Sequence, residues 1–271
     1  MTYFGNASVL PFPFLAKRVV NGFLMPDELS SGVVTVIRDL GTTKNNCGGT
    51  IISPKYVVTA AHCVVLQEDK SFPPANITIG HDNKDEEIQE VAKVSNIVLH
   101  PDYFTRKRDG KVDIAILELE SELTLGETTN RLPIYDGLIS DGQMMMSTGW
   151  GQTEENATDQ NILRGAFVIA GNKTLCQPIM NDFEDNNGPQ ICAPGALTPY
   201  TGSCMGDSGS SLIISNQGRL MHTGIVSITV NTGQTECANP TGAHFYVRTA
   251  YNMDFITETT NLTKEYLTSF G

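Results

Sequence analysis

The sequence predicts an all-β protein, and two observations carry this prediction. Short runs of β-branched and other apolar residues recur along the chain, and turn-forming Gly, Pro, Asn and Asp residues separate them. The runs cover residues 33–37, 56–59, 77–79, 97–99, 113–117, 212–214 and 224–227. Because no amphipathic helices alternate with these runs, barrels or sandwiches are favoured over βαβ units.

Composition bounds the size and the partners of the protein. The chain has 271 residues, of which 40% are hydrophobic and 18% charged, which fits one large or two small domains and excludes global disorder. The formal net charge is −12, and such an acidic surface repels phosphate backbones, so a nucleic-acid partner is not expected. No apolar run reaches the roughly 18 residues of a membrane span, so no membrane partner is expected either.

The two ends of the chain differ from its middle. Residues 1–18 contain no acid and two prolines and end on Lys17-Arg18, and they lack the basic start and the unbroken apolar stretch of a signal peptide. We therefore expect 1–18 to be a cleaved pro-segment and 19–271 to be the mature domain. Apolar residues at near-helical spacing in 251–270 predict a C-terminal helix.

Cysteines and sequons indicate the secretory pathway. The six cysteines form no Cys-x-x-Cys pair, so the spacing typical of zinc and thioredoxin-type sites is missing. Five Asn-x-Ser/Thr sequons occur, at Asn6, Asn76, Asn156, Asn172 and Asn261. Together, an even cysteine count and five sequons favour a secreted, disulfide-bonded glycoprotein.

Three short segments carry residues suited to nucleophilic catalysis. His62 follows an expected strand and stands between two alanines and a cysteine. Asp113 begins the apolar run 113–117, where a carboxylate is costly unless it is hydrogen-bonded. Ser208 lies between Gly206 and Gly209, and glycines allow the tight backbone that exposes a hydroxyl and lets a carbonyl approach main-chain N–H groups.

In this order, these segments resemble the trypsin/chymotrypsin-like serine endopeptidases over about residues 19–258. The matching pieces are RVVNG (18–22), TAAHC (59–63), DIAIL (113–117), TGWGQT (148–153), GDSGS (206–210), GIVS (224–227) and FYVRTAYNMDFI (245–256). The order His, Asp, Ser differs from that of subtilisins and of α/β-hydrolases, which argues against an esterase of the latter fold. The resemblance implies two six-stranded antiparallel β-barrels packed together, with a C-terminal helix and the active site between the barrels.

The resemblance also implies a role for each catalytic residue. Ser208 would be the nucleophile, His62 the proton carrier, and Asp113 the group that holds the imidazole. The N–H groups of Gly206 and Ser208 would form the oxyanion hole, and Ser227 would line the site of the substrate backbone. No cofactor and no metal belong to this chemistry, and the partners expected are protein or peptide substrates, an activating protease and protein inhibitors of a secreted monomer.

The same family frame pairs the cysteines. Sequence alone permits 15 pairings. The resemblance selects one of them: Cys47–Cys63, Cys176–Cys192 and Cys204–Cys237.

The junction at 18–22 resembles the activation site of the family. Cleavage after Arg18 would free the α-amino group of Val19, and in the family that ammonium inserts beside the acid that precedes the nucleophile, here Asp207. A buried carboxylate without its cation is costly, which gives a physical reason for a latent precursor. Alternatively, Asp207 is a turn residue satisfied by local hydrogen bonds.

The primary pocket lacks the acid of trypsin-like members, because Gly202 occupies its base and Ser203 adds only a hydroxyl. Thr229 stands on one wall of the pocket and His244 on the other. A gap in the alignment with the family would instead place Gly242 on that second wall. Bulky walls predict a shallow pocket for an uncharged P1 residue, and a Gly242 wall a deeper, chymotrypsin-like one. A sharper hypothesis is that a protonated His244 attracts an acidic P1. Ile228 also replaces the usual tryptophan of the SWG motif.

Two further alternatives remain open from the sequence. A scaffold that has lost catalysis would serve as a protein-binding module, although such members usually lack a triad residue and all three are present here. The acidic loop 81–87 offers oxygen ligands of the kind that calcium prefers, but His81 stands where calcium-binding members have glutamate. A solvated acidic turn is the preferred interpretation of that loop.

Overall fold

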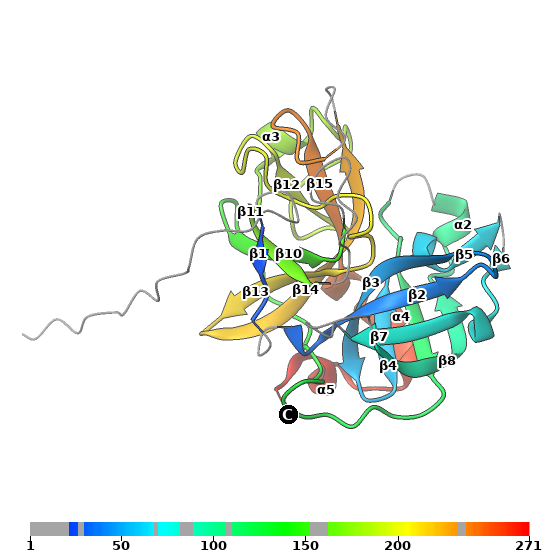
Figure 1. The fold of residues 1–271 in the computed structure, drawn as a ribbon. Coiled ribbons are helices and arrows are strands. Elements are labelled where there is room, and N and C mark those ends of the chain that lie inside the picture. The colour runs from blue at the N-terminus through cyan, green and yellow to red at the C-terminus, as the bar shows by residue number, and fades with distance from the viewer. Residues whose placement is uncertain are drawn as a thin grey trace, which may run out of the picture.

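The computed structural model describes residues 22–26, 30–67, 70–81, 89–106, 110–151, 162–231 and 237–270. Figure 1 shows two β-rich bodies side by side, the first built from the N-terminal half of the chain and the second from the C-terminal half. The proposed pro-segment 1–18 and the residue that follows it, Val19, lie outside the described residues.

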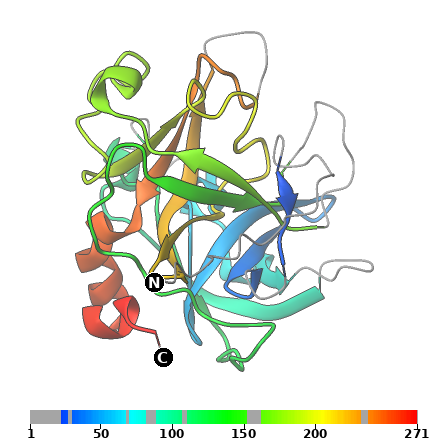
Figure 2. The same cartoon turned by 90° about the vertical axis from the view of Figure 1, so that its left-hand side faces the viewer.

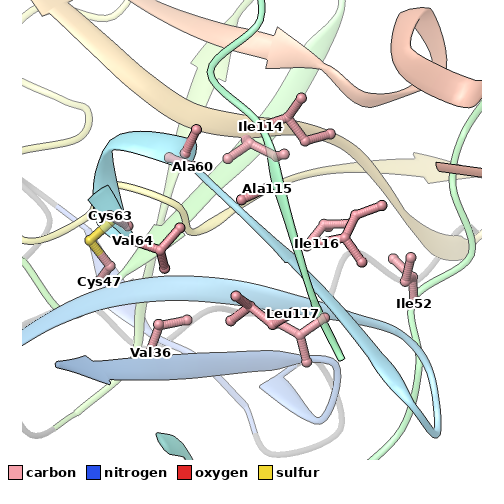
Figure 3. Packing of buried hydrophobic residues seen from close by; sticks show 14 of the residues in the cluster. Val36, Cys47, Ile52, Ala60, Cys63, Val64, Ile114, Ala115, Ile116 and Leu117 are labelled. Atoms are coloured by element: carbon pink, nitrogen blue, oxygen red, sulfur yellow. A yellow bond between two sulfur atoms is a disulfide. The ribbon is translucent and has the colours of Figure 1, made fainter. Parts of the chain in front are cut away.

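The first body is a closed six-stranded antiparallel barrel in the order β2-β3-β4-β9-β8-β7. Its strands are β2 (Val33–Asp39), β3 (Lys44–Ser53), β4 (Tyr56–Thr59), β7 (Ile77–His81), β8 (Gln89–Leu99) and β9 (Ala115–Leu119). Side chains on both faces of its strands are buried: Ile52, Ile116 and Leu117 are at most 1% exposed, although the neighbours Ile116 and Leu117 lie on opposite faces of β9 (Figure 3). Burial of these branched side chains is what stabilises the closed barrel.

The second body is a seven-stranded antiparallel sheet in the order β1-β11-β10-β13-β14-β15-β12. Its strands are β1 (Phe23–Leu24), β10 (Met144–Gly149), β11 (Arg164–Ile169), β12 (Gln190–Pro194), β13 (Ser211–Asn216), β14 (Arg219–Val230) and β15 (Ala243–Arg248). Six strands come from the C-terminal half, and the two-residue β1 extends the sheet at the β11 edge. The all-β fold class is thus confirmed, with a seven-stranded sheet in place of the second six-stranded barrel.

Short elements complete the chain. They are η1 (Ala61–Cys63), β5 (Val65–Gln67), β6 (Lys70–Ser71), η2 (Pro74–Asn76), α2 (Tyr103–Arg106), α3 (Lys173–Cys176), η3 (Thr249–Asn252), α4 (Met253–Thr260) and α5 (Lys264–Thr268). The expected C-terminal helix is present as two pieces, red in Figure 2, because Asn261 adopts a left-handed conformation (φ 56°) between them.

The C-terminal helices tie the second half of the chain back to the first. Met253 and Ile256 of α4 and Leu267 of α5 are buried in the same hydrophobic cluster as the barrel side chains, although they follow the last strand of the second sheet. Within the described residues, no helix is long and apolar enough to cross a membrane. The fold therefore places the loop of His62 on the barrel and the turn of Ser208 on the second sheet, and Gly48 N of the barrel donates to the Ser208 carbonyl.

Candidate active site

His62 is placed by the short helix η1, which begins directly after β4 of the barrel. The next residue, Cys63, is fully buried and forms a disulfide with Cys47 on β3. This cross-link fixes the backbone on both sides of the imidazole, whose side chain is 38% exposed. The local sequence thus anchors the histidine backbone while leaving its ring at the surface of the barrel.

Asp113 lies just before β9 and is only 4% exposed. Its carboxylate accepts three hydrogen bonds: from the backbone N–H of His62 to Oδ1 (2.9 Å), from His62 Nδ1 to Oδ2 (2.7 Å) and from Ser227 Oγ to Oδ2 (2.6 Å). Because a carboxylate only accepts, Nδ1 of His62 carries the proton and Nε2 presents its lone pair outward. The cost of burying this charge is offset by the three donors.

The pKa of His62 is raised and that of Asp113 is lowered, which is the combination that base catalysis by His62 needs. Burial lowers the pKa of His62, but the charge of Asp113 and the hydrogen bond to it outweigh burial, so the pKa lies above its usual 6.5. Burial raises the pKa of Asp113, but the charge of His62 and the bonds from His62 and Ser227 bring it below 3.8. Asp113 is therefore ionised and His62 is a good proton acceptor near neutral pH.

Ser208 occupies a tight turn between β12 and β13. Gly206 and Gly209 both have positive φ (95° and 81°), which side chains other than glycine rarely adopt. A Cβ on Gly209 would lie 2.4 Å from the carbonyl oxygen of Gly48 and from Thr59 Oγ1, so the turn packs directly on the barrel. Gly48 N also donates to the Ser208 carbonyl at 2.7 Å, and this bond draws the serine toward the histidine loop.

The turn places Ser208 beside His62 without joining their side chains. The Ser208 carbonyl oxygen lies 3.6 Å from Cys63 Sγ, and His62 Nε2 lies 3.9 Å from the same sulfur. In the described part of the chain, no hydrogen bond links Ser208 Oγ to His62 Nε2, as is frequent when no substrate is bound. A serine hydroxyl that comes within hydrogen-bonding distance of this lone pair can lose its proton to it when a carbonyl arrives.

The amides of this turn are available to a ligand. Among the described residues, the backbone N–H groups of Gly206 and Ser208 donate to no other protein group. Two such donors on one loop can stabilise negative charge that develops on a carbonyl oxygen.

Asp207, between these two donors, is completely buried. Its carboxylate accepts from Gly151 N and from Cys204 N, each at 2.7 Å. Burial raises its pKa to about 7, and the two backbone bonds only partly counter that rise. Within the described residues no cation pairs with this carboxylate, so it stands as a buried acid that an ammonium would stabilise.

His244 and Thr229 face each other across the pair β14 and β15, and their side chains are joined (Nδ1 to Oγ1, 3.1 Å). A Cβ on Gly202 would lie 2.1 Å from His244 Nε2, so the imidazole reaches the expected base of the pocket. A register shift between Val226 and Ile228 sets this pairing. The structure thus brings together His244 rather than Gly242 with the other pocket residues, since Gly242 precedes β15.

His244 and Ser203 of the pocket are both buried, and burial determines the charge of His244. His244 is 3% exposed, and burial lowers its pKa to about 4, so the ring is neutral at pH 7. Ser203 is 1% exposed, and its hydroxyl contacts Ser147 Oγ at 2.9 Å and the Tyr246 hydroxyl at 3.4 Å. Ile228 stands where the family has tryptophan, and its side chain packs on the loop before Asp113. A Cβ on Gly110, in that loop, would lie 2.2 Å from Ile228 Cδ1.

The structure contains the three disulfides that the resemblance implies. They are Cys47–Cys63, Cys176–Cys192 and Cys204–Cys237. One joins the two sides of the histidine loop, and the last joins the serine loop to the segment before β15.

A second serine and histidine pair, which the sequence reasoning missed, lies in the interior. His222 Nδ1 lies 2.7 Å from Ser211 Oγ, and Nε2 lies 2.8 Å from Thr249 Oγ1. A longer contact of 3.4 Å reaches Thr50 on the barrel. All four residues are 0% exposed and burial lowers the pKa of His222 to about 3, so this network is a buried tie between the two bodies that no substrate reaches.

Arg38 near the end of β2 is a further residue that the sequence reasoning missed. Its positive charge lowers the pKa of His62, although less than Asp113 raises it. No local motif marks this arginine, because only the pairing of β2 with β3 brings it toward the histidine loop.

Parts of the site expected from the sequence cannot be placed. Arg18 and Val19 lie outside the described residues, and so does most of the acidic loop 81–87. Among the described residues, one group has three ligand atoms close enough for a metal, namely Cys47, His62 and Cys63. Its two sulfurs are bonded to each other, so they are not available as thiolate ligands.

Comparison with known proteins agrees with this geometry. The sequence profile of the family described as "Trypsin" matches residues 29–256. A trypsin of Simulium vittatum is 33% identical over 238 residues, which cover 85% of this chain and 90% of that protein. A trypsin of Phaedon cochleariae is 31% identical over 219 residues (80% and 79%). A chymotrypsin-like elastase family member 1 of Canis lupus familiaris is 28% identical over 205 residues (74% and 77%).

Proposed function

Because this chain belongs to the trypsin family of serine endopeptidases, we propose that it cleaves peptide bonds through Ser208, His62 and Asp113. Ser208 Oγ attacks the scissile carbonyl carbon while His62 Nε2 takes the hydroxyl proton. The C–N bond then breaks, His62 gives that proton to the leaving amine, and water hydrolyses the acyl-enzyme by the same steps. The observation that carries this proposal is the three-donor clamp that holds Asp113 and fixes the tautomer of His62.

The oxyanion of the tetrahedral intermediate is assigned to the N–H groups of Gly206 and Ser208. Their lack of any protein acceptor in the described part of the chain supports this role. Removing one such donor typically costs about 100- to 1000-fold in rate. Ser227 contributes twice, by its bond to Asp113 and by the strand edge beside the substrate backbone.

The protein is made as a precursor whose cut after Arg18 activates it. The new ammonium of Val19 pairs with Asp207 and organises the turn that holds the two oxyanion donors. The support is the burial of Asp207 without a cation among the described residues, together with its raised pKa of about 7. A pocket without an acid binds Arg18 poorly, so a separate protease of basic specificity makes this cut.

The preferred P1 residue is small and uncharged. The His244 ring fills the space above Gly202, and its bond to Thr229 closes the opposite wall, which leaves a shallow pocket. An acidic P1 is disfavoured because burial keeps the imidazole neutral at pH 7. An aromatic P1 would need the depth that the ring occupies.

Secretion follows from the disulfides and sequons. Three disulfides among six cysteines are typical of oxidising compartments. The secreted enzyme acts as a monomer on protein or peptide substrates, under the control of its activating protease and of protein inhibitors.

The proposal is tested by a P1 profile on the form that begins at Val19. A peptide library mixed at P1 is digested, and Ser208→Ala protein prepared in the same way is the blank. Cleavage after Ala, Ser or Val, absent from the blank, is the expected result. Cleavage mainly after Arg would overturn the pocket assignment, and cleavage after Asp or Glu that grows toward pH 6 would favour a charged His244. If no peptide is cleaved, the proposal that this chain is an active peptidase is wrong.

A further inference from the structure

Arg38 stands at the mouth of the barrel. Side chains alternate along β2, so Val34, Val36 and Arg38 share one face of the strand. The two valines are 0% exposed and belong to the barrel core, whereas Arg38 is only partly buried. The arginine therefore continues the inward-facing row to the point where the barrel opens.

This end of the barrel adjoins the histidine loop. Val36 pairs with Cys47 on β3, and Arg38 pairs with Asn45 two residues further along. Figure 3 shows Val36 close to the disulfide between Cys47 and Cys63. Since Cys63 follows His62 directly, the disulfide ties the histidine loop to β3, the strand that pairs with β2, and the positive charge of Arg38 lowers the pKa of His62.

Among the residues that the structure describes, the Arg38 guanidinium has no anionic partner. Its Nε is buried and makes no hydrogen bond to any of them. Within the described residues no carboxylate pairs with it, and the neighbouring Asp39 instead accepts from Gly41 N at 2.7 Å. Within the part of the chain that the structure describes, the terminal nitrogens are neither buried without a partner nor hydrogen-bonded to another residue. A partly desolvated fork of donors is suited to a carboxylate.

The position of Arg38 relative to Ser208 decides which part of a substrate it meets. The acyl part of the substrate ends in the pocket formed by Gly202 and His244, which belongs to the second sheet. On the opposite side of Ser208 lies the barrel, whose Gly48 N binds the Ser208 carbonyl. If the acyl part lies over the second sheet, the leaving part lies on the barrel side, where the Cys47–Cys63 disulfide joins β3, the strand paired with β2.

We infer that Arg38 binds a carboxylate side chain at one of the first two residues after the scissile bond, P1′ or P2′. This inference rests on the proposed peptidase function and adds a second specificity element to it. The overall charge of −12 repels acidic substrates at long range, so the preference is local to these positions. Arg38 acts on the binding of the substrate, and its effect on bond chemistry is confined to lowering the pKa of His62.

Matched pairs of internally quenched peptides test the inference. Each pair has the same P4–P1 residues and differs only by Glu or Gln, at P1′ or at P2′. The kcat/KM ratio of Glu to Gln is measured for the wild type, Arg38→Gln, Arg38→Glu and the control Lys55→Gln. Lys55 lies in the turn at the far end of β3 and donates to the Glu120 carbonyl, so its substitution removes the same charge away from the cleft.

We expect a ratio of about 5 to 10 at one position in the wild type and in Lys55→Gln. The ratio should fall to about 1 in Arg38→Gln and below 1 in Arg38→Glu, and the wild-type ratio should shrink as NaCl rises from about 0.05 to about 0.5 M. A wild-type ratio of 1 at both positions, or one that survives in Arg38→Gln, overturns the inference.

A P1-matched arylamide substrate, whose leaving group carries no primed residues, separates the possible failures. If neither the arylamide nor any peptide is hydrolysed, the proposed function itself is wrong. If Arg38→Gln slows the arylamide as much as the Glu peptides, the arginine supports the fold of the site and binds no substrate carboxylate, which also overturns the inference.

Discussion

Asp113 holds His62 at two points, one on its backbone N–H (2.9 Å) and one on its ring Nδ1 (2.7 Å). A single carboxylate therefore fixes both the position and the tautomer of the imidazole. Ser227 secures the same carboxylate from the second sheet, so the clamp also spans the two bodies.

Replacing Asp113 by Asn should leave the fold intact and remove most of the activity. The amide of Asn can donate a hydrogen bond to Nδ1, and the ring proton would then lie on Nε2. A protonated Nε2 cannot accept the hydroxyl proton of Ser208. We expect kcat to fall by about 10⁴-fold, the size this substitution has in serine proteases. Kinetics with an arylamide substrate and circular dichroism check activity and fold. A fall in kcat of less than about tenfold would contradict the proposal that Asp113 fixes the tautomer of His62.

The pH profile of the cleaved enzyme should report the raised pKa of His62. The base must be neutral, so kcat/KM should fall as the pH drops through a value above 6.5. Asp113 raises that pKa and Arg38 lowers it, so Arg38→Gln should move the acid limb further up. Arylamide kinetics between about pH 5 and about pH 9 measure the limb. A shift of the acid limb to lower pH in Arg38→Gln would contradict this prediction.

The uncut chain should lose stability as the pH rises toward 7. Asp207 has a raised pKa, so the folded state binds its proton more tightly than the unfolded chain does. Its contribution is therefore fully present below the unfolded pKa of 3.8 and is lost as the pH rises through about 7. The expected change is on the order of a few kcal/mol.

Thermal melting of Arg18→Gln protein, which resists activation, measures this dependence at several pH values. The variant that also carries Asp207→Asn should melt with a shallower pH dependence, because its buried amide does not titrate. Equal slopes in the two proteins would mean that Asp207 finds a cation before cleavage.

Opening the pocket should widen the P1 preference. The ring of His244 and the side chain of Thr229 occupy the space into which a large P1 residue would extend. In the double variant His244→Gly, Thr229→Gly, we expect kcat/KM after Leu or Phe, relative to Ala, to rise at least about tenfold. Thr229→Gly alone, which leaves the buried ring in place, should show a smaller rise. An unchanged Ala preference in both variants would place the pocket elsewhere.

Local motifs accounted for the parts of the site that sequence could predict. His62, Asp113 and Ser208 each sit in a short segment of small or apolar residues, and their order in the chain indicated the family. The apolar runs predicted seven strands, but the longer strands β3, β10, β11, β12 and β15 were not predicted. In β3, Gly48 and Gly49 interrupt the pattern. Close approach explains these glycines, since a Cβ on Gly48 would overlap Ser210.

Features that depend on strand pairing could not be read from the sequence. The choice between His244 and Gly242 turned on a register shift in β14 that no residue type signals. The buried position of His222 and the exposed end of Arg38 likewise follow from which strands meet. A single helix was expected near the C-terminus because spacing alone does not show that Asn261 turns left-handed.

The most direct test of the central claim is the rate at which a phosphofluoridate labels the protein before and after the cut between Arg18 and Val19. The proposed mechanism predicts one phosphoryl adduct, on Ser208, that forms at least about 100-fold faster in the cut form and is not detected in His62→Ala. Peptide mapping by mass spectrometry locates the adduct. No adduct on Ser208 in the cut form, or an equal rate in His62→Ala, would show that Ser208 and His62 do not act together as proposed.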